Sequence, residues 1–364
     1  MVSPLKTALL ENEHLRVCIL NLGLRTHSLE FRVGSSWVPV IRSLNSVAAH
    51  CEDDAAFGAL VGRTAGRTRD GLAMIAGTST QLEQNHGRHH LHGGQQGMTQ
   101  ATWTLKQMGH SLSATLVSKD GEMGYPGKLQ LHCMIRLDGA SIHYELEAAS
   151  SESTYFNPTW HHYFCLGNPG AFQDQVLTIN ATHAYANDAD GIAIDERFIP
   201  APLSHKAATI ADWIASDHPQ IHQFAGLDHY FAGSKDAVLA VLEAPPIKEL
   251  SGDGANRGEA VSHSNPDNSA PRGGFDDAEG RPSAPTAEHR QTFMQTGIRM
   301  TLASSAPGLQ VYTGQKLTSK GPGLALEPMV VPNALAFDRW RSDVILAAGQ
   351  PFSRTMTLTF STFD

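Results

Sequence analysis

Histidine has an unusual frequency and spacing in this sequence. The chain contains 19 histidines, and His86, His89, His90 and His92 fall within seven residues. Imidazole is a common general acid or base and the commonest metal ligand. On a strand, His90 and His92 would point to the same face, so the cluster could chelate a metal ion in a metal-dependent hydrolase. No HExxH motif and no cysteine partner accompanies it, so for the cluster alone we favour a polar binding loop.

A second imidazole site and a separate carboxylate lie in segments of different character. His161 and His162 belong to residues 157–164, where aromatic and imidazole side chains are dense enough to form the floor of a site or the edge of a core. Glu327 follows the apolar residues 324–326. A carboxylate at the end of a buried strand has a raised pKa or a partner, and either property suits a general base. A lone glutamate at a strand end is more often simply exposed.

Two glycine-rich segments carry weaker signals. Residues 57–67 contain three glycines and two arginines, but their spacing fits neither a dinucleotide-binding motif nor a P-loop. Taken alone, this segment is typical of a tight turn with solvated arginines. Residues 121–127 form a cluster of turn residues around Tyr125, whose ring could present an apolar face to a sugar.

Taken together, these segments resemble the motifs of the aldose 1-epimerase family, also called galactose mutarotases. The matching motifs are GRTAGR at 62–67, LHGG at 91–94, GYPG at 124–127, NPTWHHYF at 157–164, QVYTG at 310–314 and LEPMVVPNA at 326–334. Each motif is weak by itself, but their shared order over nearly the whole chain, from about Asn21 to about Phe360, is highly specific. The resemblance implies a large single-domain β-supersandwich and a cofactor-independent isomerase.

The resemblance also implies roles for particular positions. His161 matches the catalytic histidine that acts as general acid, and Glu327 matches the general base. The substrate-binding positions implied are Arg67, His92, Asp228 and Gln310. The implied reaction interconverts the α and β anomers of a free aldose such as galactose or glucose, without a cofactor or a metal. Glu327 takes the proton of the C1 hydroxyl and His161 protonates the ring oxygen, so we expect Glu327 ionised and His161 protonated in the free protein.

Several positions depart from the family pattern. Gly66 stands where the family usually has asparagine, Trp160 replaces a frequent asparagine, and His162 occupies the position of a small hydroxyl residue. These departures leave the preferred aldose open, but they do not touch the acid/base pair.

Two alternatives from other classes remain. One is a catalytically silent sugar-binding module on the same fold, because a fold does not fix a function. The other is the metal-dependent hydrolase built on the histidine cluster. A glycosidase is less well supported, because it needs paired carboxylates and only Glu327 and Asp228 are candidates.

The elements that must position these residues are mostly strands. Apolar and polar residues alternate at 129–137 and again at 142–146, with Asp138 and Gly139 between them, which predicts a hairpin. Further strands are predicted at 102–108, 111–117, 238–242, 308–313 and 355–361, and one helix at 209–216. With 33 glycines and 19 prolines between short strands, the fold class predicted is all-β, a large β-sandwich with few short helices.

Length and composition set the organisation. The 364 residues, 41% of them hydrophobic, predict one domain over 1–364, with the Gly-, Pro- and Ser-rich residues 251–291 as a loop inserted between strands. We expect this loop to be a tolerated surface insertion rather than an active-site lid.

Charge and cysteine usage limit the partners. The formal net charge of −9 argues against binding to nucleic acid or to anionic membranes. Four scattered cysteines without a CxxC pair and an N-terminus without a continuous apolar segment predict a cytoplasmic protein with no signal peptide. The expected partner is a small-molecule monosaccharide, bound by a monomer or a homodimer.

Overall fold

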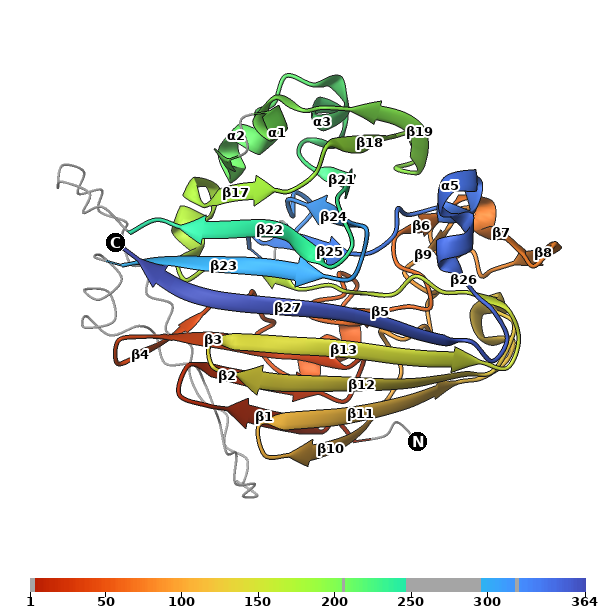
Figure 1. The fold of residues 1–364 in the computed structure, drawn as a ribbon, viewed down its shortest axis with the longest axis horizontal. Helices are drawn as coiled ribbons and strands as arrows, with labels where there is room; N and C mark the ends of the chain where they lie inside the picture. The colour runs from red at the N-terminus through yellow and green to blue at the C-terminus, as the bar shows by residue number, and fades with distance from the viewer. Residues whose placement is uncertain (1–3, 205–206, 247–295, 318–320) are drawn as a thin grey trace, which may run out of the picture.

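The computed structural model describes residues 4–204, 207–246, 296–317 and 321–364. The expected insertion at 251–291 lies outside these residues. The described chain is dominated by β-strands joined by short turns and a few short helices (Figure 1). No helix in these ranges is long and apolar enough to cross a membrane.

The described strands form two large sheets and one smaller sheet. The longest runs across the view in Figure 1 in the order β10 (Thr104–Met108), β11 (Ser111–Ser118), β12 (Leu129–Asp138), β13 (Ser141–Ser150), β27 (Pro351–Phe363), β23 (Gly297–Ser304), β22 (Ala237–Ala244), β17 (Val176–Ile179) and β20 (Ala208–Thr209). The second has the order β16 (Tyr163–Phe164), β25 (Leu324–Pro328), β24 (Gly308–Tyr312), β21 (Asp228–Ala232), β18 (His183–Asn187) and β19 (Ala193–Phe198). The smaller sheet contains β1 (Thr7–Glu11), β2 (Leu15–Leu20), β3 (Arg25–Val33) and β4 (Ser36–Pro39).

Short two-stranded pairs and helices complete the fold. The pairs are β14 (Thr154–Tyr155) with β26 (Ile345–Leu346), β15 (Thr159–Trp160) with β5 (Leu60–Val61), β6 (Arg67–Thr68) with β9 (His90–Leu91), and β7 (Leu72–Ile75) with β8 (Thr78–Gln81). The α-helices are α1 (Ala201–Ser204), α2 (Ile210–Ile214), α3 (Pro219–Phe224) and α5 (Asp338–Arg341).

The alternation in the sequence predicts the longest hairpin correctly. In β12, every second residue from Leu129 to Leu137 is buried, and β13 pairs with it antiparallel from Ser150 to Ser141. Gly139 adopts a φ of 53° in the turn between them, where glycine carries no steric penalty. The predicted strands at β10, β11, β22, β24 and β27 and the predicted helix at α2 are also confirmed.

One hydrophobic core joins the three sheets. It contains Leu29 of the smaller sheet, Leu146 of the longest sheet and Leu326 of the second, all fully buried. Phe31 stacks on Phe360 across two of these sheets, with ring centroids 5.7 Å apart. The all-β class is therefore confirmed, and the core fixes the second sheet, which carries the candidate site, against the rest of the protein.

Candidate active site

Three of the predicted site residues lie on one face of the second sheet. Antiparallel pairing places Gln310 of β24 opposite Glu327 of β25, and Asp228 of β21 opposite Tyr312. Because side chains alternate along a strand, these polar residues share a face while the residues between them, such as Leu326, enter the core on the other face. Gln310 Nε2 donates a hydrogen bond of 2.9 Å to Asp228 Oδ1.

His161 reaches this face from the loop between β15 and β16. Its backbone N–H donates to Ala59 O at 2.9 Å, and its backbone carbonyl accepts from the N–H of Gly58 at 2.9 Å. The imidazole Nε2 lies 3.5 Å from Glu327 Oε1, and each side chain is only about 5% exposed (5% and 4%). The predicted acid and base are therefore in direct contact.

Arg67 and His92 come from the short ladder of β6 and β9. Arg67 is paired with Leu91 in the register, so His92 follows immediately beside it. Arg67 Nη1 lies 3.6 Å from Asp228 Oδ2, which links this ladder to the second sheet. The ring of His92 meets that of His161 edge to face, with centroids 5.5 Å apart.

These side chains line one cavity of about 440 Å³. All six predicted site residues contribute to its wall: Arg67, His92, His161, Asp228, Gln310 and Glu327. Its volume is in the range of small-molecule sites. Residues distant in the sequence are thus brought together at a single place.

The cavity also contains side chains that the sequence reasoning did not select. Tyr163 and Tyr312 lie inside the NPTWHHYF and QVYTG motifs, so their position in these motifs was an available signal. Asn187 and Lys316 also line the cavity, but neither stands in any of the six motifs. Asn187 Nδ2 donates to Asp228 O at 2.6 Å and helps to fix the strand that carries Asp228.

Burial governs the electrostatics of the acid/base pair. It raises the pKa of Glu327 well above its ordinary value, and the charge of Asp228 raises it further while Arg67 lowers it. Burial lowers the pKa of His161 to about 4, against a smaller raising effect of Asp53 and Asp228. Both shifts have the same physical origin, because a low-dielectric environment disfavours the charged form of either group.

The starting protonation state therefore differs from the one expected. We expected an ionised Glu327 and a protonated His161, but both pKa directions favour a neutral carboxylic acid beside a neutral imidazole. The reason is that the two groups are buried together, and separating charge between them costs more than their contact returns. For one proton shared by the pair, both directions favour Glu327 over His161 as its position in the free protein.

His92 is held as a neutral hydrogen-bond donor. Its Nδ1 accepts the backbone N–H of Gly66 at 3.3 Å, which places the ring proton on Nε2. Burial, followed by the charges of His161 and Arg67, lowers the pKa of His92 well below its ordinary value. This imidazole can therefore offer an N–H to a substrate oxygen without carrying a charge.

The structure does not assemble the histidine cluster into a metal site. His92 has a φ of 51°, so the chain leaves the strand after β9 and its ring does not share a strand face with His90. The ring of His90 instead hydrogen-bonds Glu83 O at 2.7 Å and the Tyr125 hydroxyl at 2.6 Å. Among the described residues, no group of three or more His, Cys, Asp or Glu is arranged to hold a metal ion. The metal-dependent hydrolase is therefore not favoured.

Of the three single-residue departures from the family pattern, only Gly66 lines the cavity. It has a φ of 70°, and a Cβ there would lie 2.7 Å from Pro332 Cβ, so the ring of Pro332 packs where a side chain would begin. Trp160 is fully buried and packs on Tyr144, with ring centroids 5.4 Å apart. Trp160 therefore contributes to the core rather than to the wall of the cavity.

His162 is also a core residue. Its side chain is fully buried, and Nε2 lies 3.0 Å from Thr26 Oγ1 and 3.4 Å from the Tyr144 hydroxyl. Burial lowers the pKa of His162 to about 3, so it is neutral at physiological pH. The adjacent imidazoles of the NPTWHHYF motif thus have separate roles: His161 faces the cavity and His162 faces the core.

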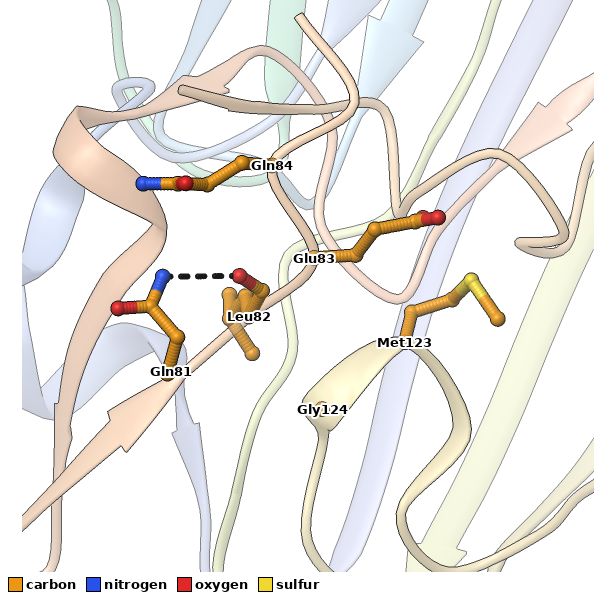
Figure 2. Close-up of a pocket in the computed structure, with 6 residues that line it drawn as sticks. All are labelled: Gln81, Leu82, Glu83, Gln84, Met123 and Gly124. Atoms are coloured by element: carbon orange, nitrogen blue, oxygen red, sulfur yellow. Dashed lines mark hydrogen bonds between the residues drawn. The ribbon is translucent and has the colours of Figure 1, made fainter. Parts of the chain in front are cut away.

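A second hollow of about 450 Å³ lies outside this site (Figure 2). It is lined by residues 81–84 together with Met123 and Gly124, and none of the six predicted site residues borders it. The Gln81 amide donates to Leu82 O at 3.0 Å, the dashed line in Figure 2, and also to Asp70 O at 3.0 Å. Because this amide already holds the loop, the hollow offers less for recognition than the first cavity.

Comparison with known proteins identifies the family of this chain. Residues 6–293 match the family model described as aldose 1-epimerase. The galactose mutarotase of Bos taurus is 31% identical over 237 residues, which cover 62% of this chain and 67% of that protein. For the galactose mutarotase of Sus scrofa the share covered is 65%, so the chain spans about two thirds of the length of these relatives. The aldose 1-epimerase of Escherichia coli K12 is 26% identical over 320 residues, or 83% of this chain and 79% of that protein.

Solved structures agree with these matches. The galactose 1-epimerase of Lactobacillus acidophilus NCFM superposes with a TM-score of 0.75 at 26% identity, covering 99% of this chain and 95% of that one. An aldose epimerase homologue from C. elegans, at 17% identity and a TM-score of 0.73, supports the fold alone. The family match spans most of the chain and contains the first four of the six motifs. The chain therefore belongs to the aldose 1-epimerase family.

Proposed function

We propose that the protein is an aldose 1-epimerase that interconverts the α and β anomers of a free monosaccharide. The observation that carries this proposal is the 3.5 Å contact between His161 Nε2 and Glu327 Oε1 in the wall of the 440 Å³ cavity. Anomers interconvert when a base and an acid act on the C1 hydroxyl and the ring oxygen. Both of these oxygens are bonded to C1, so adjacent protein groups can serve them together.

The reaction follows from one proton shared by the pair. On sugar binding, Glu327 passes its proton to His161 across their contact, because sugar hydroxyls now solvate the carboxylate. Glu327 then takes the proton of the C1 hydroxyl while the C1–O5 bond breaks and a C1 aldehyde forms, and His161 gives its proton to O5. Rotation about C1–C2 presents the other carbonyl face. Reclosure reverses both transfers and leaves Glu327 ionised beside a protonated His161. When the sugar leaves, His161 returns its proton to Glu327, which restores the starting state.

The remaining residues of the cavity bind and orient the sugar. His92 offers its neutral N–H, and Arg67 offers a guanidinium whose Nε has no hydrogen-bond partner within the described chain. These donors stabilise the charge that develops on the sugar oxygens. Asp228, held by Gln310, accepts hydrogen bonds from hydroxyls and fixes the orientation of the ring.

The family match supports a monosaccharide substrate, and the finer assignments are our own. We propose galactose or glucose as the substrate, bound by a monomer or a homodimer in the cytoplasm, with no nucleic acid or membrane partner. The net charge of −9 supports the last point.

Polarimetry on pure anomers of several aldoses tests the proposal. Glu327→Gln and His161→Asn should each lose most of the enzymatic rate, on the order of 10²–10⁴-fold, because each removes one of the two proton carriers. The matched controls are Glu147→Gln and His132→Asn, which alter a His–Glu contact of 3.2 Å on the exposed surface of the longest sheet. Both controls should keep the wild-type rate.

The same assay separates the alternatives. A wild-type protein that binds sugars in calorimetry but does not accelerate mutarotation would be a silent binding module. A near wild-type rate in either site variant would refute the assignment of the pair. Loss of activity on chelation would favour a metal site, whereas the proposal predicts no effect of a chelator.

A further inference from the structure

Arg25 and Asp53 form an ion pair that lies entirely inside the protein and does not line the cavity. Arg25 Nη1 is 2.8 Å from Asp53 Oδ2, and neither side chain has any exposed surface. Asp53 also accepts the backbone N–H groups of Ala55 at 3.1 Å and Phe57 at 2.7 Å. Arg25 Nη1 in turn donates to Phe57 O at 3.0 Å. The pair therefore fixes the backbone of residues 53–57 from both sides.

This fixed segment leads into the backbone that holds His161. The next residue, Gly58, donates its N–H to His161 O and accepts from the N–H of Thr26, each at 2.9 Å. Gly58 has a φ of 65°, and a Cβ there would lie 2.2 Å from Thr26 O, so the approach requires glycine. Thr26 directly follows Arg25 in β3. The ion pair and the backbone clamp on His161 are therefore parts of one unit.

A second route to His161 runs through aromatic rings. The ring of Phe57 lies 4.5 Å from that of Tyr163, measured between centroids, and the ring of Tyr163 lies 4.9 Å from the His161 imidazole. All three side chains are buried, so these tilted ring contacts limit how the imidazole can turn. The ion pair holds the backbone of Phe57 on both sides of this ring. Asp53 accepts its N–H and Arg25 donates to its carbonyl.

The free-energy cost of burying the Arg25–Asp53 ion pair suggests that it has a role other than stabilising the fold. Burying two charges is expensive, and apolar residues of similar volume often stabilise a core equally well or better. Apolar residues, however, make no directional hydrogen bonds to the peptide groups of residues 53–57. What the pair provides is therefore orientation of this segment rather than stability.

We propose that Arg25 and Asp53 are positioning residues that aim the imidazole of His161 at Glu327. Neither touches the substrate, and they act through the backbone of Gly58 and the ring contact of Phe57 with Tyr163. The expected effect on kcat rests on the proposed function, whereas the expected effect on the orientation of the His161 ring does not. The charged or titratable groups that surround His161 are Glu327, His92, Tyr163 and Asp228, together with the pair itself.

The test compares Phe57→Leu and Asp53→Asn with a matched control, Phe31→Leu. Phe31 is also buried and stacked on an aromatic ring, but its partner is Phe360 in the core. In polarimetric assays both test variants should lower kcat about tenfold to hundredfold, the effect of a small misplacement of a catalytic group. KM should stay unchanged, because the sugar-binding side chains are untouched. The control should keep both kcat and KM.

A pH profile adds a readout that a purely structural role would not move. Asp53 raises the pKa of His161, so Asp53→Asn should shift the acid limb of kcat/KM to lower pH. Unchanged kcat in both test variants, or an equal loss of kcat in Phe31→Leu at the same loss of Tm, would overturn the proposal. If Asp53→Asn does not fold, Phe57→Leu decides by the same split between kcat and KM.

Nitrogen-15 NMR of labelled histidines separates this inference from the proposed function. The resonance of His161 is assigned by its loss in His161→Asn. It should shift or broaden in Phe57→Leu and stay in place in Phe31→Leu, even if the wild-type protein fails to act on any aldose. An unmoved His161 resonance in Phe57→Leu would refute the positioning role, whereas an inactive wild-type protein would refute only the proposed function.

Discussion

At the scale of single residues, the proposed chemistry depends on where one proton resides between Glu327 and His161. Below a pH of about 4, His161 is also protonated. The pair then holds two protons and no longer offers a base. Above the raised pKa of Glu327, the pair loses its shared proton and no longer offers an acid. The two limits belong to the pair rather than to either residue alone.

The first prediction is therefore a bell-shaped dependence of kcat/KM on pH. The acid limb should fall near pH 4, and the alkaline limb should lie well above the ordinary glutamate pKa of 4.5. The measurement is polarimetry over a pH series, with the uncatalysed rate in each buffer subtracted. An alkaline limb at an ordinary carboxyl pKa would show that Glu327 is not shielded from solvent as described.

A second residue-scale prediction concerns stability. The folded-state pKa of Glu327 lies above its unfolded value of 4.5, so its favourable contribution is complete below pH 4.5 and is lost as the pH rises through the folded value. Glutamine is neutral throughout this range. The Tm of Glu327→Gln should therefore equal that of the wild type near pH 4 and exceed it increasingly as the pH rises from 4.5 toward the folded-state pKa of Glu327. A difference in Tm that is constant with pH would contradict the raised pKa.

At the scale of elements, helix α2 offers a test that should not involve the site. Thr209 caps this helix by accepting the N–H of Asp212 at 3.1 Å, and the Asp212 carboxylate accepts the N–H of Thr209 at 3.0 Å. The helix has only five residues, so these bonds satisfy much of its N-terminus. Its Trp213 is buried against β17, donating to Leu177 O at 3.0 Å.

Thr209→Ala should consequently lower Tm by a few degrees and leave kcat and KM unchanged. Thr209→Ser keeps the capping hydroxyl and should retain most of the wild-type Tm. Thermal unfolding and polarimetry on the same preparations check this. A marked loss of kcat in Thr209→Ala would mean that α2 is coupled to the cavity, which the contacts above do not indicate.

The elements also mark how far the sequence could predict this structure. Long strands such as β12 and β13 were predictable because their alternation is local. Two-residue strands such as β6, β9 and β15 were not, because two residues carry no period, yet Arg67 lies in β6 and His92 and His161 directly follow β9 and β15. The order of the second sheet was not predictable either, since it results from pairing between distant segments.

For the site, family motifs predicted more than periodicity could. The six matched positions converge on one cavity. Asn187 also lines this cavity, but it lies outside all six motifs, next to a register shift in β18. The face on which His92 lies was also hidden, because its positive φ ends the strand alternation from which its orientation was inferred. The pKa directions of Glu327 and His161 run against the expected protonation state for a related reason, since burial is a property of the assembled fold.

At the scale of the whole molecule, we propose that the chain is one domain. A single hydrophobic core contains buried residues of all three sheets, so no sheet can separate without exposing that core. The expected insertion at 251–291 falls between β22 and β23, which pair directly with Ala244 opposite Ile298. A short connection could therefore join these two neighbouring strands.

Replacing residues 251–291 with a short Gly- and Ser-rich linker should keep the fold and the mutarotation rate. The reason is that β22 and β23 belong to the longest sheet, whereas Asp228, Gln310 and Glu327 are carried by the second sheet. Calorimetry should show one unfolding transition both with and without the segment. Loss of activity in a folded deletion variant would assign the segment a part in the site.

The position of β25 and β27 within their sheets has a consequence for synthesis of the protein. β25 lies between β16 and β24, and β27 lies between β13 and β23, so strands late in the sequence fill interior places in both large sheets. A nascent chain emerging from the ribosome therefore contains His161, the proposed acid, long before it contains Glu327, the proposed base. Neither large sheet is complete until β25 and β27 have left the exit tunnel, so we expect an incomplete chain to be inactive.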